Sequence, residues 1–246
     1  MSGGKYHVPE KKLKSFYKKI NKHVIKEGNN IQLVERMDKF FPLVIDLDLK
    51  YKSALESRQY TSDSIQELMN FLWATVSDCV EIDDVQKYGS IWLMEKDKPY
   101  PCKKQGYEMK DGIHISFPNV IVEKSAFKKI IKVIQGSEMI QKIFIETSDI
   151  GPDNDDKNIV DSSFSSWQLY GCGKEGESPY KLTEVYRITD TGCAEKIDDE
   201  TFEAFYSDPL QIMQDITMCY RTEDNVEYKD LIVKGLKPTT SVTNTS

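Results

Sequence analysis

Apolar side chains recur along the chain at two spacings, and each spacing predicts one type of element. A spacing of three or four residues, as in Leu13, Tyr17, Ile20 and Val24, predicts an amphipathic helix. Such helices are expected at 9–27, 63–79, 125–135, 199–206 and 209–219. Alternating or short continuous apolar runs predict strands. These strands are expected at 31–35, 42–49, 90–94, 112–117, 159–161, 167–171 and 180–188.

Helices and strands follow one another without regular alternation, which predicts an α+β fold rather than a doubly wound sheet. Segment 142–146 fits either a helix or a strand, 96–111 is a polar connection rich in lysine, and 151–158 is an acidic loop. The chain has no run of about 18 apolar residues, so we expect no membrane-spanning helix. Its first residues lack an apolar region, so we expect no secretory signal.

The composition indicates a globular protein inside a reducing compartment. Hydrophobic residues make up 39 % of the 246 residues and charged residues 30 %, which is typical of a chain with a core. Five cysteines are widely spaced and form no C-x-x-C pair. This pattern argues against a zinc knuckle and favours free thiols in an intracellular, reducing environment.

The formal net charge of -7 conceals a gradient along the chain. Residues 1–27 contain eight lysines and two acidic residues, and residues 96–132 contain nine lysines and four acidic residues. Residues 184–230 carry thirteen acidic and four basic side chains. The two cationic segments either bind a polyanion or form ordinary solvated helix faces.

The strongest local feature is a pair of carboxylates inside an apolar strand, at Asp46 and Asp48. Side chains alternate between the two faces of a strand, so both carboxylates share one face while Ile45 and Leu47 take the other. Carboxylates about 7 Å apart can share a divalent cation, and burying both without one is unfavourable. About two Asp-x-Asp pairs are expected by chance in a chain of this composition, so the pattern alone is weak evidence for a metal site. The pair at Asp46 and Asp48 gains weight because it lies inside an apolar strand, where charge is hard to explain structurally.

A second strand, over 112–117, places His114 and Ser116 on one face. Strand histidines are more often structural than functional. Gly112, two residues earlier, would let a phosphate approach the backbone, and Lys110 could bind that phosphate. The histidine therefore stays a candidate rather than an assignment on this segment alone.

A third carboxylate, Asp161, follows two β-branched residues at a predicted strand end. Two glycines and Lys174 come soon after it, in Gly171-Cys172-Gly173-Lys174. These glycines could let the backbone pass a phosphate, or they could belong to an ordinary hairpin turn. Three carboxylates, a histidine and lysines together are what two-metal nucleotidyl transfer requires.

The order of these motifs resembles the archaeo-eukaryotic primase (AEP) superfamily. Its three motifs match Val-Ile-Asp-Leu-Asp at 44–48, Gly-Ile-His-Ile at 112–115 and Val-Asp at 160–161. Further segments are similar to the N-terminal primase domain of the primase-helicases of nucleocytoplasmic large DNA viruses. They are 4–9, 35–36, 112–119, 167–171 and 179–183.

The resemblance implies an AEP-like core with an RRM-like mixed or antiparallel sheet flanked by helices, plus an N-terminal α/β unit. It implies one domain over 1–236, built from two packed α/β units, with a flexible tail over 237–246. The chain would be the front part of a longer primase-helicase, because no G-x-x-x-x-G-K-[ST] motif occurs in it. Replication in the host cytoplasm is the expected setting.

The resemblance also implies roles for individual residues. Asp46, Asp48 and Asp161 would bind Mg²⁺ or Mn²⁺, and would be the catalytic carboxylates. The nucleotide-binding residues would be His114, Lys110, Lys174 and Arg36. The expected partners are a single-stranded DNA template, a primer and an NTP or dNTP.

The chain departs from the family pattern at Gly112, where many relatives have serine, and at Ser165, Ser166 and Gln168, where arginine or asparagine is frequent. These departures leave the choice between NTP and dNTP open. Two alternatives to a primase also stay open. One is a metal-dependent glycosyltransferase, which uses Asp-x-Asp for a nucleotide-sugar diphosphate. The other is a nucleic-acid-binding module without catalytic activity.

Overall fold

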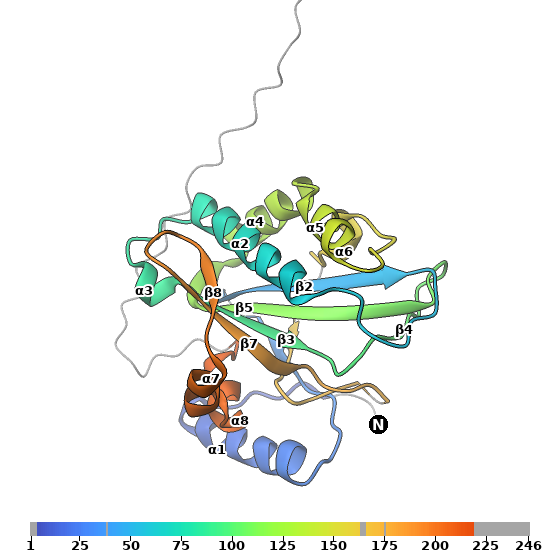
Figure 1. Ribbon diagram of the computed structural model, residues 1–246. Coiled ribbons are helices and arrows are strands. Elements are labelled where there is room, and N and C mark those ends of the chain that lie inside the picture. Colours follow the sequence, from blue (N-terminus) through green and yellow to red (C-terminus); the bar gives the residue numbers. More distant parts are fainter. Residues whose placement is uncertain (1–3, 38, 163–165, 175, 219–246) are drawn as a thin grey trace, which may run out of the picture.

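An antiparallel sheet of six strands lies at the centre of the computed structural model, which describes residues 4–37, 39–162, 166–174 and 176–218 (Figure 1). The path through the sheet is β2 (Phe40–Tyr51), β5 (Met109–Glu123), β3 (Ser90–Glu95), β7 (Lys181–Ile188) and β8 (Ala194–Lys196). A two-residue strand, β4 (Tyr100–Pro101), pairs with β5 off this path.

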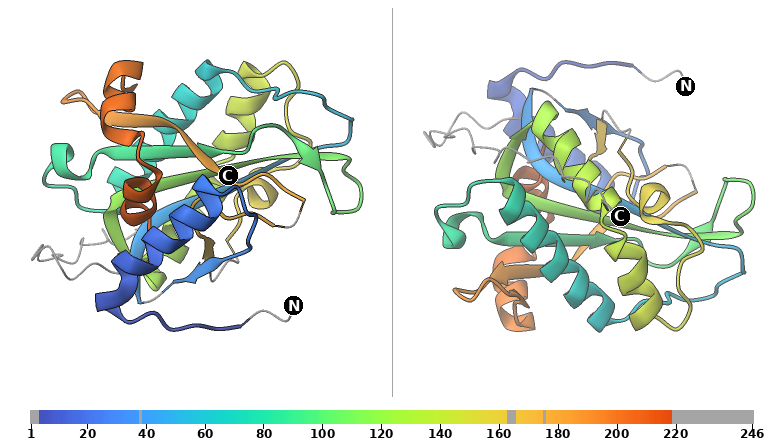
Figure 2. Two further views of the ribbon diagram at one scale, coloured as in Figure 1. Left: turned by 90° about the horizontal axis from the view of Figure 1, so that it is seen from below. Right: turned by 90° about the horizontal axis from the view of Figure 1, so that it is seen from above.

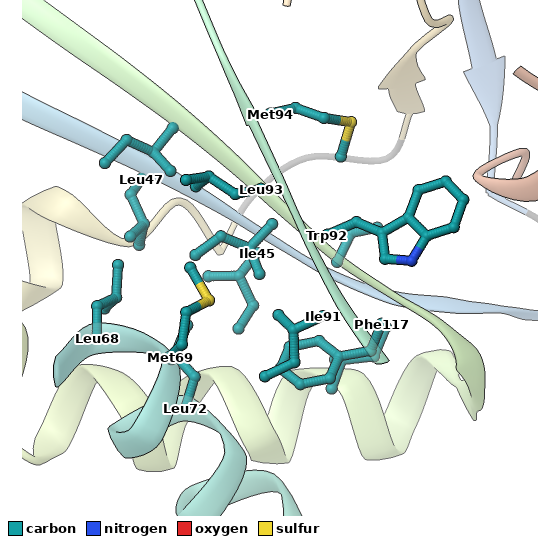
Figure 3. Close-up of a cluster of buried hydrophobic side chains, with 14 of the residues drawn as sticks. Ile45, Leu47, Leu68, Met69, Leu72, Ile91, Trp92, Leu93, Met94 and Phe117 are labelled. Carbon is teal, nitrogen blue, oxygen red and sulfur yellow. The ribbon is translucent and has the colours of Figure 1, made fainter. Parts of the chain in front are cut away.

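Helices cover one face of this sheet. They are α2 (Ser62–Cys79), α4 (Lys124–Gly136), α5 (Met139–Thr147) and the short α6 (Asp156–Ile159), with α3 (Val85–Tyr88) beside them. Helix α2 begins with a capping box between Thr61 and Ser64. Its apolar face packs against the strands, as Figure 3 shows for Leu68 and Met69 beside Ile45. This layer and the sheet enclose the main core.

A second, smaller layer lies on the opposite face of the sheet (Figure 2). It contains α1 (Glu10–Ile20), the π-helix η1 (Asn21–Lys26), α7 (Asp199–Tyr206) and α8 (Pro209–Asp215). Strand β1 (Val34–Arg36) pairs there with β6 (Ser166–Gln168). A separate small core joins α1, η1 and α8 to the segment after β6, whereas α7 packs against the main core. The residues buried in the small core are Tyr17, Val24, Leu169, Cys172 and Met213.

The structure confirms the α+β class and the type of most predicted elements, but it moves several boundaries. The helix over 9–27 divides into α1 and η1, and segment 142–146 is helical within α5. The strand expected at 31–35 shifts to β1, the predicted strand over 167–171 shortens to β6, and 159–161 forms only the single bridge between Leu47 and Val160. The acidic loop over 151–158 contains the start of α6.

The prediction that a strand ends at Pro118 is wrong, because β5 continues to Glu123. The pairing with β2 jumps from Leu43 opposite Phe117 to Pro42 opposite Ile121, so residues 118–120 bulge out of the ladder. Proline donates no backbone hydrogen bond and is tolerated at such a bulge. The predicted tail over 237–246 lies outside the described residues, as does the last residue of the helix predicted over 209–219.

None of the helices in the described ranges combines the length and apolar character needed to cross a membrane.

Candidate functional site

Strand β2 presents two carboxylates on the face of the sheet that is turned away from α2 and α4. Ile45 and Leu47 are fully buried in the main core, whereas the side chains of Asp46 and Asp48 retain about a fifth of their exposure, at 22 % and 20 %. This is the alternation that the strand pattern predicts. In the ladder with β5, Asp46 lies opposite His114.

Asp161 reaches the same place from the segment after α6. Leu47 forms a bridge with Val160, and the backbone N–H of Asp161 donates to the carbonyl oxygen of Asp46 at 2.9 Å. The negative charge of Asp161 also contributes to raising the pKa of Asp46. The segment after α6 therefore brings the backbone of Asp161 next to that of Asp46.

The electrostatics around Asp46 are unfavourable for a carboxylate. Burial, and then the charge of Asp48, raise its pKa from 3.8 to about 7, although Lys110 and Lys174 act in the opposite direction. Its Oδ1 atom is buried and accepts no hydrogen bond from the described part of the chain. A buried carboxylate oxygen without a donor fits a divalent cation, which supplies the compensating charge.

The described residues contain no group of three His, Cys, Asp or Glu side chains arranged around one metal position. This does not conflict with a Mg²⁺ site of the polymerase type. Mg²⁺ in such sites is bound by one or two carboxylates, while water and substrate phosphates supply the other ligands. Asp46 and Asp48 offer the anionic oxygens that this type of site needs.

Two lysines flank Asp48. Lys110 Nζ lies 2.5 Å from Asp48 Oδ1, and Lys50 Nζ lies 3.6 Å from Asp48 Oδ2. Lys50 also donates to the carbonyl oxygen of Asn158 at 2.8 Å, which ties β2 to the segment that leads to Asp161. Lys110, predicted as a phosphate ligand, is thus ion-paired with a predicted metal ligand in this structure.

His114 lies between two aromatic rings. Tyr180 stacks on it with centroids 3.5 Å apart and planes 13° apart, and Trp167 lies on it at 4.2 Å. Its Nε2 atom is 3.5 Å from Asp46 Oδ1. Burial, assisted by nearby lysines, holds the pKa of His114 well below its usual range. The imidazole is therefore neutral at neutral pH, and it can act as a hydrogen-bond donor through one ring nitrogen.

The other two predicted residues differ in their placement. Lys174 is exposed, and its charge affects the pKa values of both Asp46 and His114, so it lies close to them. Arg36 lies at the end of β1, opposite Ser166, and takes part in none of the ion pairs found in the described ranges. The structure brings Lys174 toward the carboxylates and leaves Arg36 on the β1–β6 ladder.

The glycines have different surroundings from those expected. A Cβ atom at Gly112 would collide with the hydroxyl of Tyr180 and would lie 3.1 Å from the hydroxyl of Tyr100. Gly171, at φ +77°, faces Ile25, and a Cβ atom at Gly173 would lie 2.9 Å from a carbonyl oxygen of its own turn. Protein atoms fill the space that the sequence predicts for a phosphate at these positions.

Sequence reasoning missed several residues around His114, namely Trp167, Tyr180, Tyr100 and Lys96. Lys96 precedes β4, Tyr100 lies in β4, Trp167 lies in β6 and Tyr180 precedes β7. Only the folded chain brings these residues together. The sequence carried a signal for Trp167 and Tyr180, since both lie in segments that resemble the viral primase domains, whereas Lys96 and Tyr100 had none.

The two cationic segments occupy different places. Seven exposed lysines lie on α1 and η1, at positions 11, 12, 14, 18, 19, 22 and 26, on the side of the sheet that carries the carboxylates. The segment 96–132 is divided by the fold. Lys96 and Lys110 lie at the site, whereas the lysines of α4 lie in the helix layer on the opposite side of the sheet.

Comparison with models of protein families shows to which family this chain belongs. The model of the "C962R protein N-terminal AEP domain" family matches residues 1–186. The chain belongs to this AEP family. The matched region includes both strands of the Asp46–His114 pairing, Asp161 and Lys174, so the AEP core contains every residue of the site.

Three viral proteins are similar to this AEP domain. "Putative helicase 121R" of Invertebrate iridescent virus 3 is 25 % identical over 240 residues, which cover 91 % of this chain and 24 % of the relative. "Putative helicase 184R" of Invertebrate iridescent virus 6 is 26 % identical over 74 % of this chain and 20 % of its own length. "Putative helicase L207/L206" of Acanthamoeba polyphaga mimivirus is 23 % identical over 74 % of this chain and 18 % of its own length. The chain thus spans about a fifth to a quarter of these relatives.

Proposed function

We propose that this AEP domain is a template-dependent primase or primase-polymerase that joins nucleotides on single-stranded DNA during viral DNA replication. The observation that supports the proposal most is the pair of carboxylates on one face of β2, with His114 opposite Asp46, Lys110 paired with Asp48, and the backbone of Asp161 bonded to that of Asp46. Nucleotidyl transfer needs positioning and charge stabilisation more than covalent chemistry, and these residues can supply both.

The three carboxylates are the proposed ligands of Mg²⁺ or Mn²⁺. Such ions, when bound, activate the attacking 3′-hydroxyl and stabilise the pyrophosphate leaving group. The mutual repulsion that raises the pKa of Asp46 would be relieved by a bound cation. Lys110 would then be released from Asp48 to bind a phosphate, because the cation would replace Lys110 as the counter-charge of this carboxylate.

His114 and Lys174 are the proposed contacts to the triphosphate. A neutral imidazole can donate one hydrogen bond to a phosphate oxygen without adding charge. The stacked ring of Tyr180 and the tilted ring of Trp167 restrict the orientation of the imidazole, and such preorganisation favours transfer. Lys174 adds a positive charge from an exposed position. Arg36 stays a predicted nucleotide contact, although it forms no ion pair within the described ranges.

The α1–η1 helix is the proposed binding surface for the nucleic-acid backbone. Its seven exposed lysines form a cationic face, and its apolar face packs beside Leu169 and Cys172, on the segment that leads from β6 toward Lys174. Phosphate contacts of this kind supply affinity without sequence preference. The net charge of -7 is no objection, because the acidic side chains are concentrated in other segments.

The names of the viral relatives support a wider proposal. Since this domain spans at most about a quarter of proteins that are named as helicases, we propose that a helicase part belongs to the same full-length chain. Replication in the host cytoplasm, a reducing compartment, is proposed on the viral origin of these relatives and on the absence of disulfides among the described cysteines.

The test is a synthesis assay with a single-stranded template, labelled nucleotides and Mn²⁺. We expect template-dependent products from the wild type, and none from Asp46→Ala or Asp161→Ala. Asp83→Ala, an exposed aspartate between α2 and α3, is the matched control and should retain activity. Absence of products from a folded wild type would reject the enzymatic proposal in favour of a binding module. Full activity of the two site variants would reject the carboxylate assignment.

A further inference from the structure

A lysine that the family motifs leave unassigned is buried beside His114. Lys96 follows β3 and is only 5 % exposed. Its Nζ atom lies 3.8 Å from the ring centroid of Tyr100 and 5.2 Å from that of Tyr180, and Tyr180 stacks on His114. A buried ammonium group needs compensation, and aromatic faces supply only part of it.

The single carboxylate that pairs with Lys96 in the described structure is Glu177, whose Oε2 atom lies 2.6 Å from Lys96 Nζ. Glu177 is shared, because Lys103 Nζ lies 3.6 Å from its other oxygen. The backbone N–H of Glu177 donates to the carbonyl oxygen of Lys174 at 3.0 Å, so the pairing carboxylate and Lys174 belong to one turn. Lys96 therefore shares its carboxylate partner with an exposed lysine.

Two lysine side chains lie on the ring of Tyr100, beside the aromatic stack on His114. Lys96 Nζ is 3.8 Å and Lys110 Nζ is 5.7 Å from the centroid of this ring, and Lys174 belongs to the turn that carries Glu177. Of their carboxylate partners, Asp48 is a proposed metal ligand and Glu177 is shared. An anion with several oxygens would suit this cluster better than either carboxylate does.

We propose that Lys96 is a binding residue for the polyphosphate of the incoming nucleotide, and that Glu177 competes with this polyphosphate for Lys96. The proposal rests on the proposed function, since it assigns a further residue to the same site. It differs from a structural ion pair in one respect. A structural pair is weakened by the loss of either partner, whereas competition gives the two substitutions opposite effects on ligand binding.

The experiment measures equilibrium binding of inorganic tripolyphosphate, and then of dATP with Mg²⁺, by titration calorimetry without template. Lys96→Met should weaken binding about tenfold or more, the effect expected for one lost charge-assisted hydrogen bond. Glu177→Gln should strengthen binding several-fold, because it removes the competing charge while keeping the side chain's size. Lys98→Met, at an exposed lysine two residues away, is the control and should bind as the wild type does.

Unchanged binding by Lys96→Met, or unchanged or weaker binding by Glu177→Gln, would overturn the proposal. If Lys96→Met does not fold, Glu177→Gln decides the question alone. The outcome is separate from that of the synthesis assay. Opposite shifts in a protein that makes no product would support the polyphosphate site and reject the polymerase, whereas wild-type synthesis with no shift would reject only the role of Lys96.

Discussion

Replacing Arg58 by methionine tests whether this side chain stabilises the fold by neutralising two buried carboxylates near the site. Arg58 donates to both oxygens of Asp111, at 3.0 and 3.4 Å, and its Nη1 atom lies 2.8 Å from Glu95 Oε1. It also donates to the carbonyl oxygen of Lys96 at 2.7 Å. The side chains of Asp111 and Glu95 are 1 % and 8 % exposed. Arg58 thus compensates two carboxylates that water barely reaches.

The expected loss in the free energy of unfolding depends on the hydrogen bonds that each carboxylate retains without Arg58. Glu95 keeps hydrogen bonds from Tyr60 and Thr183, so most of the loss concerns Asp111. Removing one partner of a buried pair destabilises a protein by about 3–5 kcal/mol. Because the Arg58 side chain is 24 % exposed, we expect the lower end, about 3 kcal/mol. For a chain of this size, that corresponds to a fall of roughly 6–12 °C in Tm.

The pH dependence has a defined sign. Burial already raises the pKa of Asp111 above 3.8, despite Arg58, and removing Arg58 raises it further. A folded-state pKa above the unfolded value means that stability decreases as the pH rises through that range. The deficit of Arg58→Met relative to the wild type should therefore be smaller at pH 5 than at pH 8. Neutralising the carboxylate in Arg58→Met/Asp111→Asn should restore part of the loss.

The assay is urea unfolding followed by circular dichroism at both pH values. Arg187→Met is the matched control, because Arg187 is exposed and its side chain donates a hydrogen bond to the hydroxyl of Tyr206. It should change the free energy of unfolding by less than about 1 kcal/mol. A loss for Arg58→Met no larger than that of the control, or a deficit that grows toward acid pH, would refute the reasoning.

Three further predictions concern the site and its surroundings. Gly112→Ala should lower the free energy of unfolding by about 1–3 kcal/mol, because the new methyl group displaces the hydroxyl of Tyr180; urea unfolding measures it. Asp46→Asn should raise the free energy of unfolding at pH 8 in the presence of a chelator by at least about 1 kcal/mol, since it removes a repelled carboxylate. Lys18→Glu should weaken binding to single-stranded DNA and reduce the salt slope by about 0.7, as a fluorescence titration at several salt concentrations will show.

Each of these predictions has a control in the same chain. Gly136→Ala introduces a methyl group where no atom lies within 4 Å, so it should not destabilise the protein. Asp83→Asn removes an exposed carboxylate and should leave the stability unchanged. Lys128→Glu changes α4, in the helix layer behind the sheet, and should alter DNA binding less than Lys18→Glu. Equal effects of a variant and its control would contradict the corresponding prediction.

The sequence predicts the features that depend on local geometry. Side-chain alternation in a strand is a property of a few residues, so the shared face of Asp46 and Asp48, and that of His114 and Ser116, follow from the pattern alone. The amphipathic helices follow for the same reason. The local pattern predicts the end of a strand wrongly where pairing with a neighbouring strand continues past a strand-breaking residue. Pro118 reads as the end of a strand, yet it lies in a bulge because β2 pairs on either side of it.

The sequence by itself therefore determined the fold class, the order of most elements and the strand faces on which Asp46, Asp48 and His114 lie. Only the tertiary structure decided which of these side chains meet: Asp46 with His114 across 68 positions of sequence, Lys110 with Asp48, and Lys96 with Glu177. It also filled the space beside Gly112 with Tyr180 and separated the lysines of α4 from the carboxylates. The physical reason is that strand register and layer packing arise from contacts between distant segments, which no local period encodes.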